Sequence, residues 1–492
     1  MTLRPFDELK VVPSEVEGRQ AQGQPEHRRG LNERNARIAL AALLFVYVLW
    51  MRTYDVASTF LMLGEQTRDW AVALGGISDL PLLGAPSTAG GRGLGPAYYW
   101  VLWLGRVTIG AFMDNLPHAG GVTVALMQSI ADAWLFLALS RRVPWTFALA
   151  ICLLIASAPF DIAISQVIWN PPVAAAFIKM ATAMALMLNV SSPPWQIGLT
   201  AAFAWMAVQC HLSGLFVAAP LLAALVLQPL LYSRPLVYQH DTSADQRRRG
   251  IRDAGRSLAI VVGVVLALQV PFVIARFTEP GAPAGPASLV SGLLHPQVFK
   301  PWVAFDTVTG ITGNLAWPLP DTFKFAMPSL IAAIIVAIVY RRDVIVIAVS
   351  GGAVLMAAML FTTSTRNYDG YWFITLITAL TLTFGMVIAA IPSRMAVTWI
   401  GVAMLLFVAW RQPARIEDST RFFKYPQYDA MLKGSREAAR RAPVLRDIRV
   451  SFEVHPTMDR QFIYKILGGR IDPAALSIAV INSDGSVKIA TD

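Results

Sequence analysis

Residues 59–105 read TFLMLGEQTRDWAVALGGISDLPLLGAPSTAGGRGLGPAYYWVLWLG, a long acidic segment punctuated by Gly and Pro. It follows the first apolar run of an otherwise strongly apolar chain and carries Glu65 and Asp69. These residues are four apart, so a helix here places both carboxylates on one face. We therefore take this segment as the candidate site and interpret the rest of the chain around it.

The composition predicts an integral membrane protein that crosses the bilayer many times. Of 492 residues, 55% are hydrophobic and only 15% are charged, and the mean hydropathy is +0.52. Apolar runs of about 20 residues recur, which is the length of a membrane helix. The formal net charge is +10, but Lys and Arg gather in short loops beside apolar runs, where they set orientation. We therefore expect the lipid bilayer, and no nucleic acid, as a partner.

The N-terminal charges set the expected topology. Residues 1–36 are polar and predict a disordered cytoplasmic tail, and the apolar run at 38–51 is the first span. Residues 98–112 are short and contain Arg106, which would cost about 2.5–3.5 kcal/mol at the bilayer centre. We expect a juxtamembrane helix there, with its aromatic residues at the interface. Together with 38–51, the remaining runs give an all-α membrane domain (37–411) of about eleven spans: 119–140, 145–160, 171–190, 195–210, 213–232, 257–277, 326–340, 344–361, 371–391 and 395–411.

Residues 412–492 differ in character and predict a small extracytoplasmic α/β module. DAMLKGSREAARRA (429–442) has the pattern of an amphipathic helix, and DRQFIYKIL (459–467) predicts a second helix. IRVSFEV (448–454) predicts a strand, and LSIAVINSDGSVKIAT (476–491) predicts two strands joined by a turn. One observation conflicts with placing the module on the extracytoplasmic side. Basic residues that usually mark a cytoplasmic end follow the last span: Arg411, Arg415, Arg421 and Lys424.

The motifs of the first loop resemble those of a known class. An acidic turn EQTRD (65–69), PLLGAPST (81–88) and a Gly-rich run that closes on GPAYYW (95–100) look like the first outer loop of polyprenyl-phosphate-dependent GT-C glycosyltransferases. This class includes the family 39 protein O-mannosyltransferases and the lipid A aminoarabinose transferases. The resemblance implies transfer of a sugar from a polyprenyl-phosphate donor to a glycan, lipid or protein acceptor. The arginines before the first span place this loop on the outer, periplasmic face. We expect a bacterial inner membrane, and an archaeal membrane is the alternative.

The resemblance implies a catalytic acidic residue in this loop. We assign the general base to Asp69, with Glu65 as the second candidate or as a partner that orients the acceptor or a metal. Solvated charges on a helix face are the alternative for both residues. Glycosyl transfer also needs a cation for the departing phosphate and a polar or aromatic cradle for the sugar. The candidates for these substrate-binding roles are Arg366, Arg92, Arg68, His211, Tyr98, Tyr99, Tyr368 and Asn170.

Two further expectations concern charges and cofactors. Asp132 and Lys179 lie inside predicted spans, where ionisable residues are costly, so we expect an ion pair between them, with a proton relay as the functional alternative. Cys152 and Cys210 sit in apolar runs and imply neither a disulfide nor a zinc site. The sequence identifies no cofactor with certainty and leaves a divalent metal open. A transporter or flippase of lipid-linked sugars is the alternative function, and a non-catalytic scaffold is the third.

Overall fold

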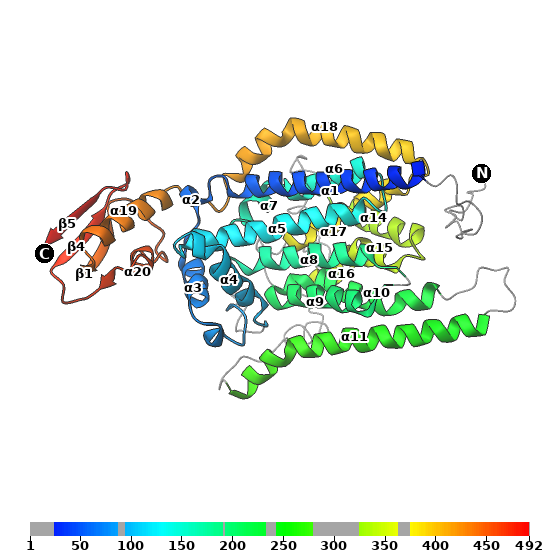
Figure 1. The fold of residues 1–492 in the computed structure, drawn as a ribbon, viewed down its shortest axis with the longest axis horizontal. Coiled ribbons are helices and arrows are strands. Elements are labelled where there is room, and N and C mark those ends of the chain that lie inside the picture. Colours follow the sequence, from blue (N-terminus) through cyan, green and yellow to red (C-terminus); the bar gives the residue numbers. More distant parts are fainter. Residues whose placement is uncertain are drawn as a thin grey trace.

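The protein is described here by a computed structural model covering residues 24–86, 94–189, 192–232, 243–278, 324–362 and 374–491. A bundle of apolar helices forms most of the molecule, and a small α/β module extends from one end of it (Figure 1). The predicted mostly helical fold with a C-terminal α/β module is therefore confirmed.

Five helical segments of the described chain are long and apolar enough to cross a membrane. They belong to α1 (Gln24–Thr53), α5 (Pro117–Leu139), η3 with α10 (Leu212–Leu231), α11 (Ser243–Thr278) and α18 (Arg394–Ser419). Shorter apolar helices are α6 (Trp145–Ala156), α14 (Ala326–Val339) and α17 (Ile374–Ala389). Each predicted span contains a helix, whereas the number of about eleven membrane crossings stays a prediction.

The helix α8 (Asn170–Met187) lies at the centre of the bundle. Its residues from Pro171 to Leu186 are all buried, because α5, α9 (Pro194–Cys210) and α17 pack around it. On the outside, α11 contacts α9 and α10 (Leu215–Tyr232), and α18 contacts α6. Apolar side chains that α11 and α18 leave exposed, such as Leu266 and Trp410, face outward as expected for contact with lipid.

Three boundaries differ from the sequence prediction. The helix α1 begins at Gln24, so residues 24–36 are helical where a disordered tail is expected; an ion pair between Glu33 and Arg37, one turn apart, supports this extension at 3.5 Å. The span at 145–160 is α6 followed by α7 (Pro159–Ile164). The span at 344–361 divides at Ser350 into α15 (Val344–Val349) and α16 (Gly351–Thr362).

The segment after α1 folds at the same end of the bundle as the C-terminal module (Figure 1). It contains α2 (Val56–Thr59), α3 (Gly64–Leu74), η1 (Ile77–Asp79), α4 (Ala97–Thr108) and η2 (Gly110–Phe112). The predicted helix at 98–112 is thus α4 with η2. Trp100, Leu104 and Phe112 are exposed on its outer surface, but Tyr98 and Tyr99 are buried rather than interfacial.

The C-terminal module consists of a three-stranded sheet, a two-stranded ladder and two helices. In the sheet, β4 (Ser477–Ile481) lies between β2 (Asp447–Val450), which is parallel to it, and β5 (Val487–Thr491), which is antiparallel. The ladder pairs β1 (Val444–Leu445) with β3 (Arg470–Ile471). The helix α19 (Tyr428–Arg441) contacts β4, β5 and α20 (Phe462–Ile466). The predicted helices and strands of the module are confirmed.

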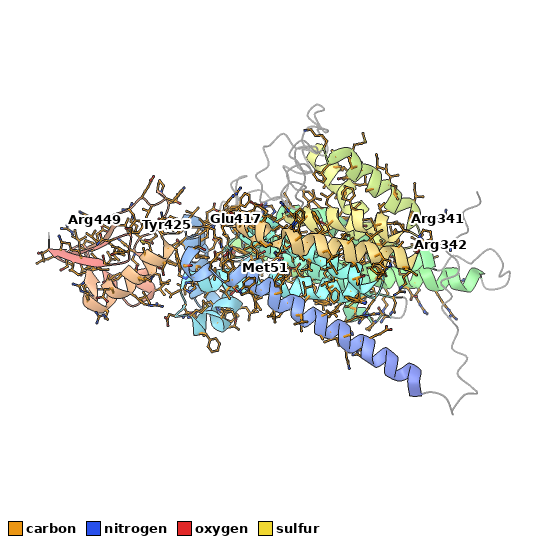
Figure 2. The ribbon with its side chains drawn as sticks, turned by 90° about the horizontal axis from the view of Figure 1, so that it is seen from above. Met51, Arg341, Arg342, Glu417, Tyr425 and Arg449 are labelled. Atoms are coloured by element: carbon orange, nitrogen blue, oxygen red, sulfur yellow. The ribbon has the colours of Figure 1, made fainter. Side chains whose placement is uncertain are left out.

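The module is joined to the first loop by direct contacts. The backbone N–H of Tyr425 donates to the Thr59 carbonyl at 2.9 Å, and Lys424 Nζ contacts the Asp55 carboxylate at 2.6 Å. The Tyr428 hydroxyl and His118 Nδ1 lie 2.9 Å apart at the start of α5. Glu417, Tyr425 and Arg449 follow one another toward this end, while Arg341 and Arg342 lie at the opposite end (Figure 2).

Candidate functional site

The helix α3 carries the two candidate carboxylates, and its first turn is fixed by its own sequence. Leu63 is extended, and Gln66 Oε1 accepts a hydrogen bond from the Leu63 backbone N–H at 3.1 Å, which satisfies a donor at the start of the helix. The fully buried Trp70 holds the other end, because its Nε1 donates to the Asn115 carbonyl at 2.7 Å. The helix is therefore anchored on both sides of Asp69.

The Asp69 carboxylate is buried, with 2% of its side-chain surface exposed. Three groups donate to it: Arg68 Nε at 2.8 Å, the Tyr99 hydroxyl at 3.0 Å and the Tyr98 hydroxyl at 3.1 Å. Burial raises the pKa of Asp69 above its ordinary value, and the hydrogen bonds from these donors oppose the rise. The two tyrosines come from α4, so this contact also joins α4 to α3.

The Glu65 carboxylate differs from Asp69 because its side chain is exposed. Its Oε2 accepts a hydrogen bond from Trp169 Nε1 at 3.0 Å, just before α8 begins. The Trp169 ring in turn packs edge-on against Phe423, with ring centroids 5.1 Å apart. A single indole N–H leaves most of a carboxylate's acceptor positions open. Glu65 is thus held in place and still open to a reactant.

Arg68 lies between the two acids and is partly exposed, at 38% of its side-chain surface. Its bond to Asp69 uses Nε, so its two Nη groups are the donors directed away from that contact. The hydrogen bond to Asp69 raises the pKa of Arg68 despite the opposing effect of burial. Glu65, Arg68 and Asp69 therefore form one charged group on α3, with an oriented guanidinium between an exposed and a buried carboxylate.

The two ends of the Gly-rich loop lie together beside the end of α9. The Gly84 backbone N–H donates to the Leu94 carbonyl at 2.8 Å and closes the loop. A Cβ at Gly95 would lie 2.5 Å from Gln209 Cδ, so the backbone before α4 passes close to the Gln209 side chain of α9. Gln209 is two residues before His211, which brings the loop base and His211 into one region of the fold.

His211 and Asn170 have structural partners in this region. The Asn170 Nδ2 group donates to the Cys210 carbonyl at 2.7 Å and joins the start of α8 to the end of α9. The buried His211 has its Nδ1 2.6 Å from the Ser213 hydroxyl. Three further candidates, Arg92, Arg366 and Tyr368, lie outside the described residues. Among the described residues, no three His, Cys, Asp or Glu side chains gather as potential metal ligands.

A buried cluster of four charges lies deeper in the bundle. Lys179 Nζ contacts Asp132 at 2.9 Å and Asp161 at 3.1 Å. Arg52 contacts the same carboxylates at 2.7 Å and 2.5 Å, and all four side chains are fully buried. The predicted contact between Asp132 and Lys179 is confirmed. Arg52 and Asp161 were not predicted as partners, because they lie at the ends of their apolar runs, where a charge reaches water without a partner.

The sequence matches no protein-family model and no curated protein. Among solved structures, apo ArnT from Cupriavidus metallidurans has a TM-score of 0.52 and 14% identity, covering 86% of this chain and 84% of that one. ArnT from the same organism bound to undecaprenyl phosphate has a TM-score of 0.49 and 13% identity, covering 87% of this chain and 84% of that one. An Archaeoglobus fulgidus oligosaccharyltransferase in complex with Zn and sulfate has a TM-score of 0.47 and 11% identity, covering 88% of this chain and 62% of that one.

The likeness to apo ArnT concerns the fold, because the sequence identity is low. Over 86% of its length, the chain has an overall fold similar to that of ArnT. The resemblance predicted from the motifs in residues 65–100 is therefore confirmed at the level of the fold.

Proposed function

We propose that this protein is a membrane glycosyltransferase that moves a sugar from a polyprenyl-phosphate donor to a glycan, lipid or protein acceptor. The observation that carries the proposal is the charged group on α3, in which an exposed carboxylate lies beside an oriented guanidinium. The fold shared with ArnT supports the class of reaction. The donor lipid and the acceptor would meet outside the cytoplasm, at the end of the bundle that carries α3 and the C-terminal module.

In this proposal Glu65, rather than Asp69, is the general base. A base must come within hydrogen-bond distance of the hydroxyl that it deprotonates, and the exposure of Glu65 supports this order of the two acids. The acceptor oxygen attacks the anomeric carbon as its proton passes to Glu65. The bond from that carbon to the phosphate oxygen breaks, and the lipid phosphate leaves with the electron pair.

Arg68 would stabilise the departing phosphate through its Nη groups, because a guanidinium binds a phosphate through two parallel hydrogen bonds. Asp69 would act as a positioning residue, since its bond to Arg68 Nε fixes the guanidinium plane. Tyr98 and Tyr99 would hold Asp69 in turn. Arg92, Arg366 and Tyr368 stay candidates for the sugar and the phosphate, as do His211 and Asn170. If a divalent metal takes part, Glu65 is the exposed carboxylate on α3 that would meet it.

The test compares matched substitutions in a strain from which the chromosomal gene is deleted. Mass spectrometry of surface glycans and lipids identifies the decoration that the deletion removes. We expect Glu65→Gln to lower transfer by about 10²–10⁴-fold, the usual contribution of a general base, while donor binding is kept. Asp69→Asn should weaken donor binding as well, because it loosens Arg68.

The control is Glu453→Gln, which makes the same chemical change at an exposed position of the C-terminal module and should leave transfer unchanged. Full activity of Glu65→Gln would reject Glu65 as the base. Movement of the sugar across reconstituted vesicles without bond transfer would reject the glycosyltransferase function and favour a transporter.

A further inference from the structure

A cavity of about 350 Å³ lies at the end of the bundle away from α3. It is bounded by α9, α10 and the first turns of α11, and Asp343, which follows Arg341 and Arg342, lines one side of it. Figure 2 shows those two arginines at the end opposite the C-terminal module. The cavity is therefore remote from the candidate active site.

Two arginines of α11 line this cavity, Arg249 and Arg256. They are seven residues apart, so they lie two turns apart on the same face of the helix. Arg142 also lines the cavity, but its charge is already matched by Asp343 at 2.5 Å. Within the described residues, neither Arg249 nor Arg256 has a carboxylate within ion-pair distance. Asp253 also lines the cavity, between the two arginines along the helix, and lies 3.9 Å from Arg252, which does not line it. The wall from α11 therefore carries two positive charges and one negative charge, and its net charge is positive.

The rest of the lining has an apolar and a polar part. Leu188, Ile197, Leu225 and Pro229 are apolar, whereas Asn189, Ser192, Gln228 and Ser257 are polar. Beyond the cavity, the outer surface of α11 continues with exposed apolar side chains from Leu258 to Leu266. Apolar side chains do not stabilise a small hydrated anion, whereas they do stabilise the apolar part of an amphiphile. The lining thus fits a charged head joined to apolar chains.

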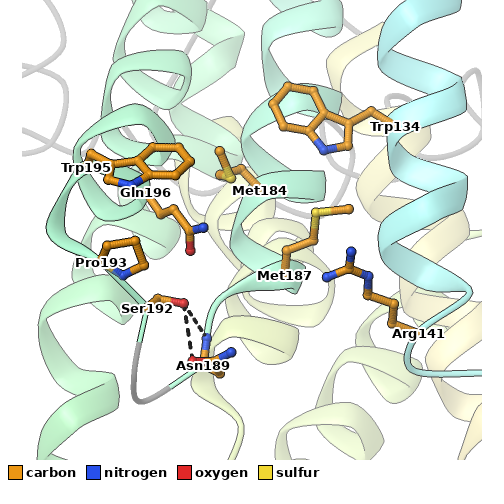
Figure 3. A pocket seen from close by; sticks show the side chains of 9 residues that line it. All are labelled: Trp134, Arg141, Met184, Met187, Asn189, Ser192, Pro193, Trp195 and Gln196. Atoms are coloured by element: carbon orange, nitrogen blue, oxygen red, sulfur yellow. Dashed lines mark hydrogen bonds between the residues drawn. The ribbon is translucent and has the colours of Figure 1, made fainter. Parts of the chain in front are cut away.

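A neighbouring cavity of about 410 Å³ indicates the depth of this region in the membrane (Figure 3). It shares Asn189 and Ser192 with the first cavity. Trp134 and Trp195 project into it from α5 and α9 (Figure 3), and Trp195 is 60% exposed. Tryptophan is enriched where hydrocarbon meets the polar head groups. The cavity beside α11 therefore lies at the level of phospholipid head groups.

We propose that the cavity between α9, α10 and α11 binds the head group of an anionic phospholipid. Arg249 and Arg256 bind the phosphate, the glycerol contacts Ile197 and Leu225, and the acyl chains follow the outer surface of α11. Basic cavities between membrane helices on the cytoplasmic side are suited to acidic head groups. Inorganic phosphate shares the charge of this ligand but not its apolar part.

The experiment uses the full-length protein in neutral detergent micelles and phosphatidylglycerol as the probe, with binding followed by native mass spectrometry. Two basic residues contribute about 1 kcal/mol each, so Arg249→Gln with Arg256→Gln should weaken binding roughly 30-fold. The matched control is Arg248→Gln with Arg341→Gln. It removes the same charge from exposed positions that do not line the cavity, and it should bind lipid as the parent does.

A third variant separates the two sources of phosphate. Ile197→Trp fills the apolar side of the cavity without changing its charge, so it should weaken phosphatidylglycerol binding and leave phosphate binding unchanged. If both double arginine variants lost phosphatidylglycerol binding equally, the proposal would be overturned in favour of general charge attraction. Displacement of the lipid by an equal concentration of inorganic phosphate would overturn it in favour of a free-anion site. Neither readout depends on sugar transfer.

Discussion

At the scale of single residues, the protein matches buried carboxylates with donors in two different ways. Asp69 has one guanidinium and two phenol hydroxyls, and burial still raises its pKa. Asp132 and Asp161 instead share Arg52 and Lys179, so their cluster carries no net charge. Such a neutral cluster is stable when all four charged side chains are present. Removing one of them leaves a buried charge without a partner.

This balance predicts how the cluster responds to substitution. Lys179→Met leaves two buried carboxylates facing one arginine and should lower the free energy of unfolding by about 3–5 kcal/mol. The double variant Asp132→Asn with Lys179→Met restores the balance and should recover part of that loss. The measurement is reversible unfolding in bilayer discs, arranged as a double-mutant cycle.

A matched lysine on the surface provides the control for this cycle. Lys433 contacts Asp429 one turn away on α19, and both side chains are exposed. Lys433→Met should therefore change stability by at most about 1 kcal/mol. If Lys179→Met were as mild as Lys433→Met, the buried cluster would be shown to contribute no more than a surface pair.

The sequence predicted only part of this residue-level picture, for a physical reason. An ion in the middle of an apolar run needs a partner, so Asp132 and Lys179 could be paired from their positions alone. Arg52 lies at the end of its run, where a charge reaches water without a partner, and it therefore gave no such signal. Likewise, Tyr98 and Asp69 are 29 residues apart, and only the packing of α4 on α3 brings them together.

At the scale of the elements, the position of α4 depends on close packing against α5. A Cβ at Gly105 would lie 2.3 Å from the Thr123 hydroxyl oxygen and 2.8 Å from Thr123 Cβ. Thr123 is buried and β-branched, and its hydroxyl donates to the Ala119 carbonyl at 2.8 Å, so it has little room to move. A side chain at position 105 must therefore push the two helices apart.

We accordingly expect Gly105→Ala to lower the free energy of unfolding by about 1–3 kcal/mol, the usual cost of overpacking. It should also reduce transfer, because α4 carries the tyrosines that hold Asp69. Thermal unfolding and transfer activity are measured on the same preparation. Gly255→Ala is the control, since a Cβ there meets nothing within 4 Å and alanine favours a helix. Parent-like behaviour of Gly105→Ala would show that α4 adjusts freely.

Helix positions were predictable from apolar runs, but interruptions within them were not. The run at 344–361 is apolar on both sides of Ser350, Gly351 and Gly352, and Ser350 leaves the helical conformation. A Cβ at Gly351 would lie 2.8 Å from the Ala333 carbonyl oxygen, so α16 begins where its backbone meets α14. Hydrophobicity indicates that a segment is buried, whereas the exact course of the helix depends on its neighbours.

At the scale of the whole molecule, two of the four basic residues after the last span have partners in other parts of the protein. Arg415 is buried and donates to the Ser157 and Leu154 carbonyls at 2.6 Å and 3.0 Å, near the end of α6. Lys424 binds the Asp55 carboxylate. These cations stabilise the packing of α18 and the module. Charges used in this way need not mark the cytoplasmic side, which a count of Lys and Arg cannot recognise.

The arrangement predicts which positions share a side of the membrane. Ser78 lies in η1 beside α3, Arg449 lies in the module at the same end, and Arg342 lies at the opposite end (Figures 1 and 2). Both native cysteines are buried, so single cysteines introduced at exposed positions report on topology. In intact cells, a membrane-impermeant maleimide should label Ser78→Cys and Arg449→Cys, and it should label Arg342→Cys only after permeabilisation.

The pattern of labelling separates two aspects of the topology. If Arg342→Cys alone reacted in intact cells, the fold would stand but the candidate site would face the cytoplasm, and a donor presented on the outer leaflet would be excluded. If Ser78→Cys and Arg449→Cys reacted under different conditions, the contact of the module with the first loop would be wrong. If Ser78→Cys and Arg449→Cys are both labelled in intact cells, Glu65 and the module lie on the outer face of the membrane. The proposed lipid-linked donor would be used on that face.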